Sequence, residues 1–143
     1  MLKKETRYDS YAYRIADLSA SAALIASDFE EGMLLQFDTN GELEKADGTK
    51  PAFMAMSSAR KGRDQFVGKT TTAVSVMFGP ARVSTTNFVA EESYAAGTPL
   101  YAGANGLVTT TKGAYLVGYA VKEPVDGYLT MFLTVPVPTG AGA

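Results

Sequence analysis

Residues 97–121, GTPLYAGANGLVTTTKGAYLVGYAV, contain three short apolar stretches that are separated by glycine-marked turns. Residues 32–56, GMLLQFDTNGELEKADGTKPAFMAM, repeat this layout earlier in the chain, and no gap is needed to align the two segments. The matching positions include the Asn-Gly pairs and the glycines at the turns. Glycine is favoured where the backbone requires a positive φ. The spacing therefore predicts a small all-β domain made of two related half-units.

The rest of the chain has a similar pattern of short apolar segments. We expect strands over residues 33–37, 42–45, 52–58, 72–78, 81–85, 98–102, 107–111, 115–122 and 128–135. Strands of this length and spacing predict a compact barrel or sandwich. The last strand carries apolar residues on both faces, which indicates that both faces are covered. Pro136 and Pro138 are expected to end its pairing.

Two acidic segments are expected to form single helical turns. Residues 27–30, SDFE, have the S-x-x-E form of a capping box, and Gly32 would end the turn. Residues 91–96 are the counterpart in the second half-unit, before Gly97. On this interpretation, the Glu pairs at 30–31 and 91–92 are stabilised by the helix dipole rather than placed for catalysis.

Residues 1–28 differ in composition from the rest of the chain. They are slightly basic, contain three tyrosines and end in an Ala/Ser-rich stretch. We predict three parts: an N-terminal arm over residues 1–28, the β domain over residues 29–138 and a flexible tail over residues 139–143. The arm is interpreted as a segment that docks on a neighbouring protein. Alternatively, it is a poorly ordered leader or a strand of the same domain, and a helix over residues 13–26 is also possible.

Two groups of residues are the candidate protein contacts. In the arm they are the basic and tyrosine side chains, since tyrosine gives a large contact area with few rotatable bonds: Lys3, Lys4, Arg7, Tyr8, Tyr11, Tyr13 and Arg14. The second group lies in the most charged stretch, residues 60–70: Arg60, Lys61, Arg63, Asp64 and Phe66. This stretch is either a solvated loop or a contact with an acidic protein surface. Its GKT sequence is not a phosphate loop, because Arg63 stands where that motif requires glycine.

Composition argues against several functional classes. The chain has 143 residues, no cysteine, no histidine and a net charge of −2. The usual general base and the commonest metal ligand are therefore missing. Asp38, Asn40 and Glu42 have alternating spacing that resembles a calcium loop, but the further glutamate and central glycine are lacking. We expect no catalytic residue, no metal or cofactor, no secretion signal, and no nucleic-acid, membrane or small-molecule partner.

Five motifs together suggest a family: ADGT at 46–49, PAFMAM at 51–56, GTPLYAGANGLVTTT at 97–111, AYLVGYAV at 114–121 and GYLTMFLTV at 127–135. In these segments the chain resembles the small tulip-like capsid cement (head decoration) proteins of tailed double-stranded DNA phages. The resemblance covers residues 29–135.

The resemblance implies a β-tulip-like domain and a homotrimer on the outer surface of the virion head, made in the host cytoplasm. It further implies that the protein binds the major capsid protein and bridges neighbouring subunits against the pressure of packaged DNA. Two alternatives remain: another virion structural β-module, such as a head-fibre base or tail component, and a soluble ligand-binding β-barrel.

Overall fold

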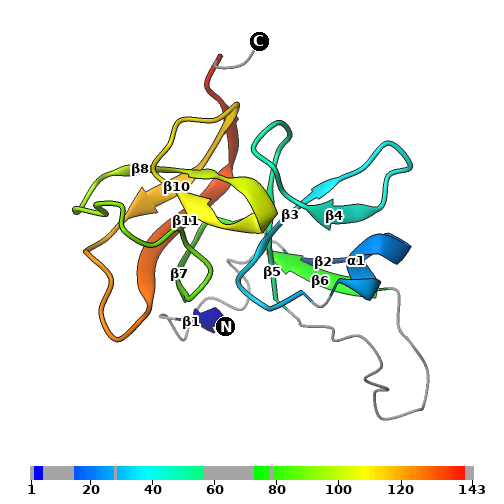
Figure 1. Ribbon diagram of the computed structural model, residues 1–143, viewed down its shortest axis with the longest axis horizontal. Coiled ribbons are helices and arrows are strands. Elements are labelled where there is room, and N and C mark those ends of the chain that lie inside the picture. Colours follow the sequence, from blue (N-terminus) through cyan, green and yellow to red (C-terminus); the bar gives the residue numbers. More distant parts are fainter. Residues whose placement is uncertain (1, 5–14, 28, 57–72, 78, 141–143) are drawn as a thin grey trace.

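The computed structural model describes residues 2–4, 15–27, 29–56, 73–77 and 79–140, and it consists of two antiparallel sheets (Figure 1). The six-stranded sheet has the order β1 (Leu2–Lys4), β7 (Ala81–Thr85), β11 (Leu129–Pro138), β10 (Tyr115–Ala120), β8 (Pro99–Ala102) and β9 (Val108–Thr109). The five-stranded sheet has the order β2 (Ile15–Ser19), β6 (Ala73–Met77), β5 (Phe53–Ala55), β3 (Leu34–Phe37) and β4 (Leu43–Lys45). A short helix, α1 (Ala22–Ala26), and a 3₁₀ turn, η2 (Ala104–Gly106), complete the described elements. The predicted all-β class is confirmed.

The two sheets have the same internal order, which confirms the two related half-units. Strands β2, β6, β5, β3 and β4 correspond in turn to β7, β11, β10, β8 and β9, and β1 is an addition to the second set. Individual hydrogen bonds repeat as well. The Gly32 N–H donates to Ala55 O at 2.7 Å, and the Gly97 N–H donates to Ala120 O at 2.8 Å. The strands thus form equivalent pairings at matching positions of the repeat.

The glycines that begin the half-units have the backbone that their position requires. Gly32 has φ 88° and Gly97 has φ 85°, in the left-handed region that other residues avoid. Gly106 also has a positive φ, and a Cβ built there would lie 2.6 Å from Leu34 O. At this position glycine is needed for conformation and for the close approach of the two half-units.

The predicted helical turns next to these glycines are wrong. The described helix lies earlier, at α1, where the Ser21 Oγ accepts a hydrogen bond from the Leu24 N–H at 3.1 Å. Ser27, which we expected to begin a helix, is the residue that ends α1. Residues 91–96 hold no helix: Glu91, at φ 70°, and Ala96 lie in turns, and the residues between them are irregular. An Ala-rich segment after a serine favours helix more strongly than an acidic pair before glycine.

The last strand is longer than predicted, because β11 continues through Pro136 to Pro138. Beyond Leu133 it no longer pairs with β7, and its register with β10 shifts between Leu116 and Gly118. Residues 134–138 therefore have one unpaired side. Proline is tolerated there, because the side without a partner needs no N–H donor.

The described parts of residues 1–28 contribute strands to both sheets. β1 pairs with β7, β2 pairs with β6, and α1 places Leu24 in the core with 2% of its surface exposed. For these segments, the alternative of strands within the same domain is the right one. The predicted tail also begins with an anchored residue, since the Thr139 Oγ1 donates to Gly113 O at 2.7 Å.

The core has two layers, which together cover both faces of the five-stranded sheet. Between the sheets, Leu34, Met54 and Met77 pack in one cluster with residues of the six-stranded sheet: Val83, Leu100, Val108, Ala120, Leu129 and Met131. The opposite face of the five-stranded sheet is covered by Leu24 of α1 and by Phe29. The six-stranded sheet uses one face for the core, so its two faces have different environments.

Candidate functional site

The contact residues predicted from sequence are only partly within the described chain. Lys3 and Lys4 lie in β1, where their backbones pair with Ser84 and Val83 of β7. The other arm candidates, Arg7, Tyr8, Tyr11, Tyr13 and Arg14, lie outside the described residues. So do Arg60, Lys61, Arg63, Asp64 and Phe66, which belong to the connection between β5 and β6. The two groups stay predictions.

A pocket of about 440 Å³ lies where the two half-units meet. One wall is the turn at residues 47–49 of the first half-unit. The other wall comes from the second half-unit: Val89, Glu92, Ala102, Gly103, Ala104, Thr109, Thr111, Lys112 and Gly113. Two carboxylates, several hydroxyls and one amine therefore line a space large enough for a small molecule.

Glu92 is held in this pocket by several donors. Its carboxylate accepts hydrogen bonds from the Thr109 Oγ1 at 2.8 Å and the Thr110 N–H at 2.9 Å, and the Tyr94 hydroxyl lies 3.1 Å away. Burial by itself would raise the pKa of Glu92, but the bonds from Thr110, Thr109 and Tyr94 together lower it. Glu92 is thus kept ionised and ties the 91–96 turns to the end of β9.

Tyr94 is the buried residue beside Glu92. The residue is fully buried, and its hydroxyl lies 2.6 Å from Val89 O. Burial is the main cause that raises the pKa of Tyr94, and the neighbouring Glu92 raises it further. Tyr94 is therefore neutral at physiological pH, and its hydroxyl keeps its proton for hydrogen bonding beside Glu92.

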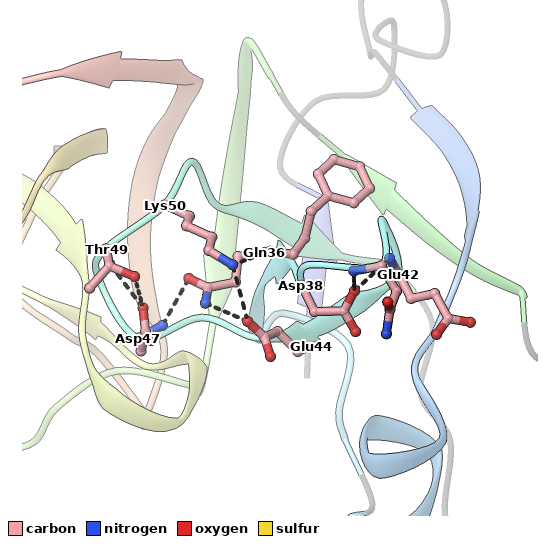
Figure 2. A network of polar contacts seen from close by, with 9 residues as sticks. Gln36, Asp38, Glu42, Glu44, Asp47, Thr49 and Lys50 are labelled. Carbon is pink, nitrogen blue, oxygen red and sulfur yellow. Dashed lines mark hydrogen bonds and ion pairs between the residues drawn. The ribbon is translucent and has the colours of Figure 1, made fainter.

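Asp47, on the other wall, is also committed to its own turn (Figure 2). Its Oδ1 accepts hydrogen bonds from the Thr49 Oγ1 at 2.6 Å and the Thr49 N–H at 2.9 Å. These two bonds are the main reason that the pKa of Asp47 is lowered. The Asp47 N–H donates to the Gln36 Oε1 at 3.2 Å, and the Gln36 Nε2 donates to the Glu44 Oε2 at 2.8 Å. The chain of contacts fixes the turn to β3 and β4.

Lys50 extends this network at the end of the first half-unit. Its Nζ donates to Phe37 O at 2.9 Å and lies 3.8 Å from the Glu44 Oε2 (Figure 2). The side chains of Lys50 and Glu44 are 40% and 39% exposed, so the ion pair contributes little to stability. The network serves to hold loops in place.

The suggested calcium spacing has a local explanation. The Asp38 Oδ1 accepts hydrogen bonds from the Asn40 N–H at 2.8 Å and the Glu42 N–H at 2.9 Å (Figure 2). Asp38 therefore bonds to the backbone of its own turn, as expected for aspartate in this position. Nowhere in the described ranges do three acidic side chains come together in the way that a metal site requires.

The sequence did not reveal the roles of Glu92, Tyr94 and Glu123. The Glu123 Oε1 accepts the Tyr94 N–H at 2.7 Å, and its Oε2 accepts the Ser93 hydroxyl at 3.1 Å. Our assignment of Glu92 to a helix dipole is wrong, because residues 91–96 form no helix and Glu92 instead bonds to Tyr94, to Thr109 of β9 and to Thr110. These contacts join residues that are far apart in sequence. The run of threonines at 109–111 is the one local feature of the sequence that indicates a nearby hydrogen-bond acceptor such as the Glu92 carboxylate.

A second surface feature lies on the outer face of the six-stranded sheet. Cross-strand pairing places Pro99 next to Tyr119, Tyr119 next to Phe132, and Phe132 next to Arg82. We call these four residues the outer row. Tyr119 is 42% exposed and Phe132 is 54% exposed. The prediction that both faces of the last strand are covered is therefore wrong for Phe132, although Thr130 is buried.

Comparison with known proteins adds no identification. No family model, curated protein or solved structure matches the chain. No helix in the described part of the chain is long and apolar enough to span a lipid bilayer.

Proposed function

We propose that the protein is a structural capsid decoration protein, which binds the outer surface of a phage head and bridges neighbouring major capsid subunits. The proposal rests first on the sequence resemblance over residues 29–135. The observation that carries it further is the division of roles within the fold. The polar groups around the pocket hold turns in place, while Tyr119 and Phe132 are left exposed on the outer face of the six-stranded sheet.

The body has the properties that such a role requires. Two sheets stacked through one apolar cluster form a unit with little internal freedom, because close-packed interiors resist deformation. The carboxylates of Asp47, Glu92 and Glu123 are each bonded to backbone or hydroxyl donors. They act as braces at the loops, which suits a protein whose function is to transmit mechanical load.

The attachment is assigned to the basic arm and to the charged stretch between β5 and β6. Lys3 and Lys4 are in β1, at one edge of the six-stranded sheet. Several such contacts on a homo-oligomer bind by avidity, which strengthens attachment by about 10² to 10⁴ over a single contact. Modest individual contacts therefore suffice, and no reacting group is needed.

Co-sedimentation with undecorated expanded capsids of the encoding phage tests this function. The full chain is expected to sediment with the capsids and to raise their melting temperature. The double variant Lys3→Glu/Lys4→Glu reverses two charges without shortening the chain. It should weaken binding to the capsids at low salt. Lys50→Glu, on the β3–β4 side of the domain, is the control and should bind normally. Failure of the full chain to bind would refute the function, and normal binding by the Lys3/Lys4 variant would refute the arm assignment only.

The pocket favours one alternative, a soluble ligand-binding module. Its volume of about 440 Å³ and its hydroxyl lining suit a small polar molecule. A panel of sugars and polyols tested by thermal shift would distinguish the two functions. A saturable stabilisation that is lost in Lys112→Met would support the ligand-binding alternative, whereas an unchanged melting temperature supports the structural role.

A further inference from the structure

Asparagine precedes glycine at corresponding positions of the two half-units, Asn40-Gly41 and Asn105-Gly106. In this dipeptide asparagine loses its side-chain amide most readily, because glycine has no Cβ to hinder its backbone nitrogen. Asn40 and Asn105 are both exposed. The environment of the following glycine differs between the two sites, so one molecule allows a direct comparison of their reactivity.

The reaction uses only the main chain, the asparagine side chain and water. The glycine nitrogen attacks the asparagine Cγ, the Cγ–Nδ2 bond breaks, and the proton of the glycine N–H leaves with the amide as ammonia. The product is a cyclic succinimide. Water then adds to one of its two carbonyl carbons, and the ring opens to aspartate or to isoaspartate. To attack, the glycine nitrogen must give up its hydrogen bond and turn towards the asparagine side chain.

The fold permits this movement at Gly41. Its N–H donates to Asp38 O at 3.2 Å, a long bond that joins residues of the same turn. Gly41 is exposed, and a Cβ built there would meet no atom within 4 Å. The Asp38 Oδ1 accepts the N–H groups of Asn40 and Glu42, on either side of Gly41, and leaves the reacting nitrogen outside this pair of bonds (Figure 2).

The first half-unit opposes the same movement at Gly106. The Gly106 N–H donates to Ala46 O at 2.9 Å, so the bond crosses from one half-unit to the other. Gly106 is buried, and a Cβ built there would lie 2.5 Å from the Met33 Cγ and 2.6 Å from Leu34 O. Turning this glycine towards Asn105 breaks the bond to Ala46 and displaces packed atoms. Reaction there requires a local opening between the half-units.

We propose that Asn40 is a deamidation site of the folded protein, and that Asn105, in the same dipeptide, is protected by the packing of Gly106. A group that reacts only after local opening reacts more slowly, in proportion to the small population of the open state. At Asn40 the reacting nitrogen is already at the surface, and only the turn has to move.

The modification changes the turn between β3 and β4. It places a new carboxylate between Asp38 and Glu42, where like charges repel one another. Isoaspartate also adds an atom to the main chain between the two N–H groups that the Asp38 Oδ1 binds. The turn therefore becomes more acidic and less tightly held. This inference goes beyond the proposed function and does not depend on it.

Peptide mapping of the full chain, kept folded in mildly alkaline buffer and sampled over several weeks, measures both sites. Trypsin separates them, because Asn40 falls in residues 15–45 and Asn105 in residues 83–112. We expect conversion at Asn40 to be faster by about tenfold or more, since a local opening must precede reaction at Asn105. A protein isoaspartate methyltransferase, which labels isoaspartate but not aspartate, should label the peptide with Asn40.

The unfolded chain is the matched control. In urea the two dipeptides are equally free, and their rates should agree within about twofold. The variant Gly41→Ala tests the attacking nitrogen: its Cβ has room in the fold but hinders the attack, so conversion at Asn40 should slow. Equal rates in the folded protein, absence of conversion at Asn40, or the same ratio of rates in urea as in the folded protein would overturn the proposal. An unchanged rate at Asn40 in Gly41→Ala would overturn it as well.

Discussion

Met77 and Phe132 occupy corresponding positions in the two half-units, but Met77 is 0% exposed and Phe132 is 54% exposed. The difference arises because the units stack through unlike faces. One copy of the repeated face becomes core, and the other remains surface. The same pattern of strands therefore places one set of side chains in the core and the corresponding set at the surface.

Alanine substitutions at these positions should have different effects on stability. Met77→Ala leaves a cavity in a filled core and is expected to lower the free energy of unfolding by about 2–5 kcal/mol. Phe132→Ala removes a side chain that is half exposed in the monomer, and the loss should be below about 1 kcal/mol. Urea unfolding at low protein concentration measures both. Equal losses would show that the two sheet faces are covered alike.

Removing the charge of Glu92 should loosen the braced turns. In Glu92→Gln, an amide replaces a carboxylate that accepts bonds from Thr109 and Thr110, and the loss is expected to be about 1–3 kcal/mol. Glu91→Gln is the control, because Glu91 is exposed and should change the free energy of unfolding by less than about 0.5 kcal/mol. A similar loss in the two variants would argue against a bracing role for Glu92.

Stability should fall in acid in a way that depends on Glu92. Its pKa is lower in the folded protein than in the unfolded chain, so the unfolded chain binds more protons as the pH falls. The contribution is complete above the unfolded value of about 4.3 and is lost as the pH drops through the folded pKa. Asp47 acts in the same direction. Melting temperatures between pH 2 and pH 7 should show a shallower acid decline in Glu92→Gln, and identical slopes would contradict the assignment.

Tyr94 should affect the alkaline side. Its pKa is raised by burial, so the unfolded chain loses this proton at a lower pH than the folded protein. Its contribution is present below about pH 10 and falls as the pH rises further. Tyr94→Phe should remove this part of the alkaline decline and cost about 1–3 kcal/mol near neutrality, since Glu92 loses a donor. Tyr115→Phe is a control at a partly exposed site, and the same change in both variants would rule out a special role for Tyr94.

Two corresponding glycines separate backbone conformation from close packing. Gly41 and Gly106 have φ of 77° and 73°, but an added Cβ meets nothing within 4 Å at Gly41 and lies 2.6 Å from Leu34 O at Gly106. Gly41→Ala should cost about 1 kcal/mol for its backbone alone. Gly106→Ala should cost a further 1–3 kcal/mol, approximately, because the half-units must move apart. Equal losses, measured by thermal unfolding, would show that the contact at Gly106 is not tight.

The sequence by itself determined the elements that depend on neighbouring residues. The strand segments follow from the alternation of apolar and polar side chains along the chain. The turn at Asp38 follows because an aspartate side chain readily accepts hydrogen bonds from nearby backbone N–H groups. Even the duplication could be recognised, because positive-φ turns select glycine at fixed spacing. Locally, the sequence also contained Ser21 before an Ala-rich run, but the S-x-x-E motif at residues 27–30 pointed to a helix that does not form.

Only the tertiary structure decided which faces are covered. The pattern of side chains along a strand indicates that the two faces of its sheet differ in polarity. Which segment covers each face depends on how distant parts of the chain pack together. For this reason Met54 and Met77 are core, Tyr119 and Phe132 are surface, and prolines continue β11 along a side without a partner. The bracing by Glu92 likewise joins residues 17 and 18 positions away, at Thr109 and Thr110. Burial and long-range hydrogen bonding are properties of the folded chain, and no local pattern specifies them.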